Sequence, residues 1–145
     1  MSTSLAGGIG TPIFFIALLN FVSIGMSNCT QEFSAFIPKA NADPSRSPDV
    51  RFIDCAQGGQ TAAIIRDPNA MFWNVANQRL RASGSSPMQP QIVWLKEANA
   101  QPSGGFLVTA GQLRDDLAKV VRIIHTKYPN VRLCYVTSRI YAGYA

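Results

Sequence analysis

Four short runs of apolar, β-branched and aromatic residues are spaced along the chain, with segments of helical periodicity between them. The runs are residues 14–24, 50–54, 91–95 and 131–136, and each is bounded by Pro, Gly, Asn or Ser residues that favour turns. This pattern predicts four strands. Strands that alternate with helices indicate an α/β fold, in which a parallel sheet has helices packed on both faces.

Residues 110–127 carry the clearest helical pattern. Apolar residues recur there at helical spacing, while charged residues cover the other side of the predicted helix. The apolar positions are Leu113, Leu117, Val120, Val121 and Ile124, and the charged positions are Arg114, Asp115, Asp116, Lys119 and Arg122. Thr109 is a suitable N-cap, and Pro129 prevents continuation of the helix. Two further helices are predicted, one between residues 60 and 81 and a short one after Ser27.

The composition is that of one globular domain, residues 1–145. Hydrophobic residues make up 47% of the chain and charged residues 14%, and a chain of this length can bury a substantial core. The net charge is +5, but the Lys and Arg residues are scattered and form none of the basic stripes typical of nucleic-acid binding. We therefore expect no nucleic-acid partner.

Residues 9–26 are strongly apolar, and no charged residue precedes Glu32. Three interpretations are open: a strand buried on both faces, a signal peptide cleaved after Gly25, and a membrane span. The strand is favoured, because Pro12 and Asn20 interrupt a span and no Lys or Arg opens a signal peptide. No membrane span is expected, while a cytoplasmic and a secreted location both stay open.

The three cysteines, Cys29, Cys55 and Cys134, contain no Cys-x-x-Cys pair, and His125 is the only histidine. This composition does not predict a metal site, and no cofactor is expected. Cys29 and Cys55 follow the ends of strands that we expect to be neighbours, so a disulfide between them is one alternative. Cys134 is expected to be an unpaired strand residue.

Three residue types suited to ester chemistry follow the ends of the first three predicted strands. Ser27 follows the first strand, Gly58 and Gly59 follow the second, and Asn99 follows the third. Ligands bind outside the carboxyl ends of parallel strands, so a nucleophile and oxyanion donors would meet at this edge. The simpler interpretation is structural: Ser27 or Asn28 as an N-cap, the glycines as a turn, and Asn99 as a loop residue.

From about Val22 to Ala145 the chain resembles the SGNH (GDSL-type) hydrolase superfamily, in particular its carbohydrate acetylesterase-like branch. In that branch the nucleophile lies in a Gly-x-Ser-Asn turn after the first strand, which reads Gly25-Met26-Ser27-Asn28 here. The resemblance implies a three-layer, flavodoxin-like α/β/α sandwich, for which we expect the strand order 2-1-3-4. It also implies hydrolysis of a small acyl (acetyl) ester, including esters of carbohydrates. Ser27 would be the nucleophile and first oxyanion donor, Gly58 or Gly59 the second donor and Asn99 the third.

The chain departs from the family pattern at the catalytic base. Met26 replaces the usual Asp, the Gly-x-Asn-Asp block reads Glu97-Ala98-Asn99-Ala100, and no Asp-x-x-His block follows. The resemblance therefore implies an incomplete domain, truncated after the fourth strand, with impaired activity. His125 is expected at the opposite end of the sheet from Ser27, and Asp54 could orient a base but has none near it in sequence.

Two further residues are candidates for substrate binding. Glu97 could bind a sugar hydroxyl and Arg139 an anionic group, although exposed loop charges are the simpler interpretation of both. The alternative to an enzyme is a non-catalytic α/β module that binds a carbohydrate or a protein partner over the same cleft. An unpaired fourth strand would also favour self-association through the edge of the sheet.

Overall fold

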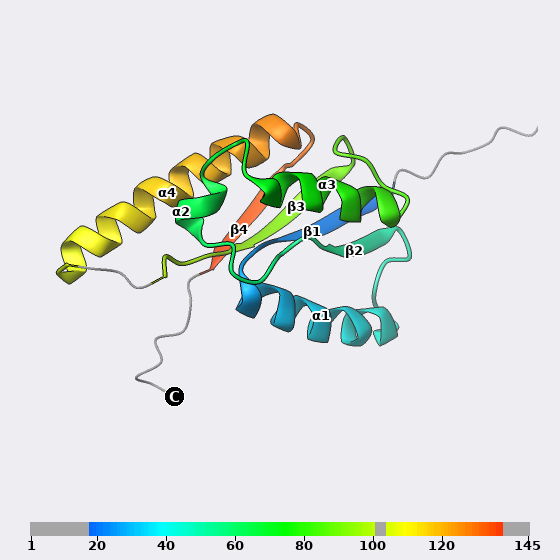
Figure 1. The fold of residues 1–145 in the computed structure, drawn as a ribbon. Helices are drawn as coiled ribbons and strands as arrows, with labels where there is room; N and C mark the ends of the chain where they lie inside the picture. Colours follow the sequence, from blue (N-terminus) through cyan, green and yellow to red (C-terminus); the bar gives the residue numbers. More distant parts are fainter. Residues whose placement is uncertain (1–17, 101–103, 138–145) are drawn as a thin grey trace, which may run out of the picture.

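The computed structural model describes residues 18–100 and 104–137 of the chain. Four strands, β1 (Leu19–Gly25), β2 (Val50–Asp54), β3 (Pro90–Lys96) and β4 (Leu133–Thr137), form one parallel sheet (Figure 1). Their order is β2-β1-β3-β4, as predicted. The predicted run 14–24 corresponds to β1, although its residues 14–17 lie outside the described residues.

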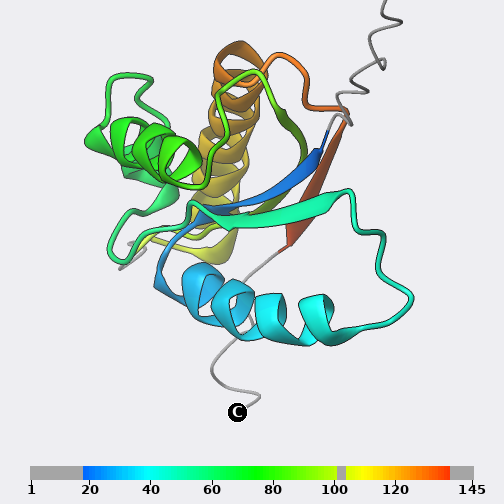
Figure 2. The ribbon, with the colours of Figure 1, turned by 90° about the vertical axis from the view of Figure 1, so that its right-hand side faces the viewer.

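The helices cover the two faces of the sheet unequally. Helix α1 (Ser27–Ala42) lies on one face, while α2 (Ala62–Ile65), α3 (Met71–Ala82) and α4 (Phe106–Lys127) lie on the other (Figures 1 and 2). This arrangement confirms an α/β fold with three layers. No helix in the described part of the chain is both long and apolar enough to cross a membrane.

The main core lies between the sheet and helices α3 and α4. The large side chains that are less than 2% exposed and face this layer are Val22, Ile24, Val93, Leu95, Ile65, Phe72, Trp73, Leu80, Val120, Ile124 and Tyr128. Burial of these apolar side chains is the main stabilising contribution, at about 1.5–3 kcal/mol for each large aliphatic or aromatic side chain. An aromatic cluster on the opposite face joins Phe21, Phe33, Phe36, Phe52 and Trp94.

Two helix predictions are wrong in their boundaries. The single helix predicted between residues 60 and 81 is divided into α2 and α3, because Pro68 has no N–H to donate and disfavours a helical residue before it. The indole N–H of Trp73 in α3 donates to the carbonyls of Ile65 (3.1 Å) and Asp67 (3.0 Å), and these bonds fix the segment between α2 and α3 against α3. Helix α4 begins at Phe106 with Gly105 as its N-cap, so the predicted cap Thr109 lies inside the helix.

The predicted disulfide between Cys29 and Cys55 is also wrong, since both thiols are free and buried. The Cys29 sulfur contacts the carbonyl of Ile24 at 3.6 Å, whereas the Cys55 sulfur contacts the carbonyl of Ala76 in α3 at 3.7 Å. The sulfur of Cys29, a residue of α1, therefore lies against the end of β1, whereas the sulfur of Cys55 lies against α3. Burial raises the pKa of each thiol to about 12, so neither is a reactive thiolate near neutral pH.

Candidate functional site

Ser27 lies at the carboxyl edge of the sheet, where the chain passes from β1 into α1. It is the first residue of the helix, and its side chain is exposed. Met26 occupies the N-cap position without a side-chain cap, so the predicted capping role of Ser27 or Asn28 is wrong. The first N–H groups of a helix have no partner within the helix, so the N–H of Ser27 is not used by α1 itself.

Gly25 allows this turn to pass directly against the end of β3. A Cβ atom at Gly25 would lie 2.2 Å from the carbonyl oxygen of Lys96 and 2.7 Å from the Cβ of Cys29. No larger residue fits without displacing backbone. The close approach fixes the start of α1, and with it Ser27, at the junction of β1 and β3.

The glycine loop after β2 lies beside Ser27. The N–H of Gln57 donates to the carbonyl of Gly25 at 2.8 Å, and the N–H of Gln60 closes a turn onto the carbonyl of Gln57 at 3.4 Å. Gly59 occupies this turn with φ +76°, a conformation that favours glycine. A Cβ at Gly58 would lie 3.9 Å from the Cβ of Ser27. The structure thus brings together two of the residues that the sequence places in one site.

Asp54, at the end of β2, fixes the first turns of α1. One of its carboxylate oxygens accepts a hydrogen bond from the hydroxyl of Ser23, and the other accepts from Thr30 and, at 3.3 Å, from Ser34. The N–H of Ala56 adds a bond of 3.1 Å. In the structure the Asp54 carboxylate is therefore bound to hydroxyl groups of β1 and α1 and helps to hold the helix that starts with Ser27.

Asn99 lies after β3, at the same edge of the sheet, but its amide is bound to α2 and α4. Its Oδ1 accepts the N–H of Ala63 (2.9 Å), and its Nδ2 donates to Asp116 (2.9 Å), which also binds Arg66 (2.5 Å). Burial favours a raised pKa for Asp116, but the bonds from Asn99 and Arg66 and the charge of Arg66 outweigh it and hold the pKa below its usual value. The sequence pattern placed Asp116 on the charged face of its helix, which is wrong, since its side chain is buried.

Glu97 is buried rather than exposed. Its residue is only 2% accessible, its Oε2 accepts the N–H of Ala98 at 3.2 Å, and its Oε1 has no partner among the described residues. Burial raises the pKa of this carboxyl to about 8, although the N–H groups of Ala98 and Ala62 act in the opposite direction. The protonated, neutral form is therefore the stable form at neutral pH.

The Glu97→Gln variant is expected to lose part of the pH dependence of stability. The folded pKa of Glu97, about 8, lies above the ordinary value of 4.5, so between these values the unfolded chain releases a proton that the folded chain keeps. This contribution to stability is complete below pH 4.5 and is lost as the pH rises to about 8. Urea unfolding at pH 5, 6.5 and 8 should show a shallower fall for the variant, which becomes more stable than the parent at pH 8. Equal slopes would contradict this assignment.

His125 is far from Ser27 along the fold. Helix α4 runs from the carboxyl edge after β3 to the amino end of β4, and His125 lies exposed near its end. The neighbouring connection is fixed at the amino end of β3, where the N–H of Arg132 donates to the carbonyl of Gln91 at 2.8 Å. Arg139 lies outside the described residues. Within residues 18–100 and 104–137 no cluster of three His, Cys, Asp or Glu could hold a metal ion.

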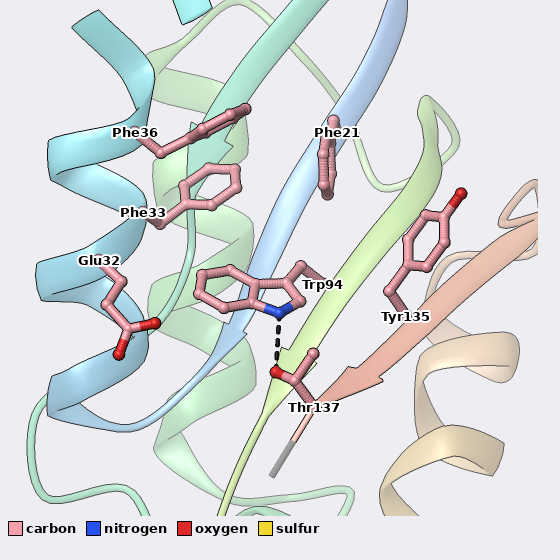
Figure 3. A pocket seen from close by; sticks show the side chains of 7 residues that line it. All are labelled: Phe21, Glu32, Phe33, Phe36, Trp94, Tyr135 and Thr137. Carbon is pink, nitrogen blue, oxygen red and sulfur yellow. Dashed lines mark hydrogen bonds between the residues drawn. The ribbon is translucent and has the colours of Figure 1, made fainter. Parts of the chain in front are cut away.

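An apolar groove of about 510 Å³ lies between α1 and strands β1, β3 and β4 (Figure 3). Its lining residues are Phe21, Glu32, Phe33, Phe36, Trp94, Tyr135 and Thr137. The indole N–H of Trp94 donates to the hydroxyl of Thr137 at 2.8 Å, and the ring stacks on Phe33 at 5.9 Å. Lys96 pairs with Glu32 at 2.6 Å beside the groove. The sequence signal for this face is the alternation of side-chain direction along each strand, which places Phe21 of β1, Trp94 of β3 and Tyr135 of β4 on the same side of the sheet.

Comparisons of the chain with known protein families, with curated proteins and with solved structures found no match. The structure itself gives the class of protein. It is an α/β protein with a parallel sheet, and an exposed serine lies at a strand-to-helix turn beside Gly58.

Proposed function

We propose that the chain is a serine ester hydrolase of the SGNH type, acting on small acyl esters such as acetyl esters, including those of carbohydrates. The observation that carries this proposal is the exposed Ser27 at the start of α1, with the backbone of Gly58 directly beside it. A helix N-terminus supplies free N–H groups and a positive dipole end, and both favour a developing oxyanion.

In the proposed reaction the hydroxyl oxygen of Ser27 bonds to the ester carbonyl carbon, and the carbonyl oxygen becomes the oxyanion. The N–H groups of Ser27 and of Gly58 or Gly59 are the proposed donors to it. Asn99 is the third, through the amide hydrogen that it does not give to Asp116. The ester C–O bond then breaks, the alcohol leaves with the serine proton, and water releases the acid from the acyl-enzyme. Arg139 is also a proposed contributor to substrate binding. Glu97 is a proposed contributor too, although its carboxyl is buried and a substrate reaches it only after a movement of the loop after β3.

A fluorophosphonate probe tests the nucleophile without requiring turnover. Attack by Ser27 forms an O–P bond and expels fluoride with the serine proton. Even without a base, oxyanion donors and substrate binding retain an acceleration of about 10³-fold, so Ser27 should be labelled at least about 100-fold faster than the exposed Ser45. Mass spectrometry of peptides locates the adduct. Ser27→Ala should abolish it and Ser45→Ala should leave it, whereas equal labelling of both serines would contradict the proposal.

A second candidate function is a non-catalytic module that binds a carbohydrate or a protein partner. The observation that favours it is the groove with its accessible aromatic rings, combined with the distance of the only histidine from Ser27. Self-association through β4 belongs to this second proposal, since Leu133, Tyr135 and Val136 are each about half exposed (49%, 54% and 52%). A folded chain that the probe does not label at Ser27 would favour this function.

A further inference from the structure

We propose that the apolar groove between α1 and the sheet binds a carboxylate ligand with an apolar body, and that the ligand carboxylate takes the place of the Glu32 side chain on the Lys96 ammonium. The inference goes beyond the proposed function and does not depend on Ser27, because the residues that carry it line the groove or lie next to its wall.

The walls of the groove suit an apolar body of the size of a small arylalkyl group. The volume of about 510 Å³ lies in the range of ligand sites. Phe33 and Trp94 stack with their ring centroids 5.9 Å apart, a distance at which aromatic rings attract one another. Phe36 and Tyr135 leave 40% and 54% of their surface exposed and offer the same kind of contact to a ligand (Figure 3).

The ion pair between Glu32 and Lys96 forms the polar part of this site. Of the described residues that line the groove, Glu32 is the charged one, and it lies on α1 together with Phe33 and Phe36 (Figure 3). The Nζ of Lys96 lies 2.6 and 2.7 Å from the two carboxylate oxygens of Glu32 and 5.8 Å from the ring centroid of Trp94. A ligand carboxylate in the position of the Glu32 carboxylate would therefore contact the ammonium while its apolar body lies against the Trp94 ring.

The two partners of the ion pair differ in burial, and this difference decides which of them a ligand can replace. The Lys96 side chain is 7% exposed, whereas the Glu32 side chain is 48% exposed. A buried ammonium needs a counterion, because its removal from water is otherwise costly. A half-exposed carboxylate can turn into the solvent at little cost, since ion pairs with an exposed partner add little stability. The exchangeable group is therefore the anion, and a ligand that displaces it must supply another anion.

This arrangement makes Glu32 an internal competitor of the ligand. Removal of the Glu32 charge should strengthen the binding of a carboxylate, because the ligand then supplies the counterion that Lys96 has lost. A cationic ligand with the same body would meet the ammonium of Lys96 at this end of the groove and should bind poorly.

Three probes with the same apolar body and different charges test the ligand class: 4-phenylbutyrate, its neutral amide and 4-phenylbutylamine. Each is titrated into the parent chain, and Kd is read from the emission of Trp94, since Trp73 is 1% exposed in the other layer. The carboxylate should bind at least about tenfold more tightly than the amide, and the amine should bind most weakly.

The alternative occupants of the groove give different results in the same experiment. Equal affinities for the carboxylate and the amide, which a neutral ligand such as a carbohydrate would predict, overturn the proposal, as does tightest binding of the amine. A chain that binds none of the three probes also overturns it. If light scattering shows that this chain is a dimer, a second copy is then the favoured occupant.

The Glu32→Gln variant tests the competition directly. It should bind 4-phenylbutyrate about fivefold more tightly than the parent and the amide equally well. The matched control is Asp115→Asn, which removes the same charge from an exposed position of α4 (60% exposed side chain) on the other face of the sheet and should leave both Kd values unchanged. Weaker binding of the carboxylate by Glu32→Gln, or equal tightening in Asp115→Asn, would overturn the proposal.

The Lys96→Met variant tests the ammonium itself. It keeps a long apolar side chain, so it should still bind the amide but lose the preference for the carboxylate. A preference that persists in this variant contradicts the role of Lys96. If the variant does not fold, the probe series with the parent and with Glu32→Gln still decides the question.

Discussion

Ester hydrolysis by the 145-residue chain is expected to be about 10⁴- to 10⁶-fold slower than by a serine hydrolase with a complete catalytic base. The serine hydroxyl must lose its proton as it attacks, and a neutral hydroxyl is a weak nucleophile without a group to accept that proton. The chain has one histidine, His125, and α4 carries it to the amino side of the sheet, away from Ser27. The measured quantity is acetate release from a soluble acetyl ester.

Imidazole in the buffer should restore part of this activity, because the turn at Ser27 is exposed and a small base can reach it. The informative quantity is the difference in rate between the parent and Ser27→Ala, since imidazole also hydrolyses activated esters by itself. This difference should rise with imidazole concentration, and His125→Ala should not change it. Activity that survives in Ser27→Ala at the parent level would contradict the nucleophile assignment. Loss of activity with both Ser27→Ala and His125→Ala would show instead that His125 is the base.

Gly25→Ala is expected to lower the free energy of unfolding by about 3 kcal/mol or more. The added methyl group would lie 2.2 Å from the carbonyl oxygen of Lys96 and 2.7 Å from the Cβ of Cys29, and neither atom is the end of a flexible side chain. Relief of this overlap requires the end of β1 to move away from β3. Urea unfolding measures the loss, and labelling of Ser27 should fall with it.

Gly111→Ala is the matched control for this substitution. Gly111 lies inside α4, and a Cβ atom there meets nothing within 4 Å. Alanine loses less conformational entropy than glycine on entering a helix, so this variant should gain about 0.5–1 kcal/mol. Similar losses in both variants would show that the contact at Gly25 is not the cause.

Sequence patterns predict the strands and the position of the loops that follow them, because both depend on residues that are close together in the sequence. The strands are apolar runs bounded by turn residues, and the carboxyl ends of parallel strands necessarily share one edge, which brings Gly58 to Ser27. The same local patterns do not predict which charged residues are buried. Asp116 is buried because Arg66, 50 residues away in sequence, and Asn99 bind it, and no local pattern encodes such partners.

Glu97 is a second charged residue whose burial the sequence does not predict. A carboxylate beside a loop predicts exposure, yet the packing of two helix starts around the end of β3 removes it from water. The groove escaped prediction for a related reason. Its lining comes from α1 and from three strands that are far apart in the sequence, so the groove is a property of the layers rather than of any one segment.

The two tryptophans of the chain lie on opposite sides of the sheet. The fluorescence of each tryptophan therefore reports on a different layer of the protein. Trp73 is 1% exposed and is enclosed by α2, α3 and Tyr128 in the main core. Trp94 lines the groove on the α1 side, with the Lys96 ammonium 5.8 Å from its ring. Quenchers dissolved in the solvent therefore act on one indole, and an occupant of the groove alters the emission of that indole, while the other reports only on the integrity of the core.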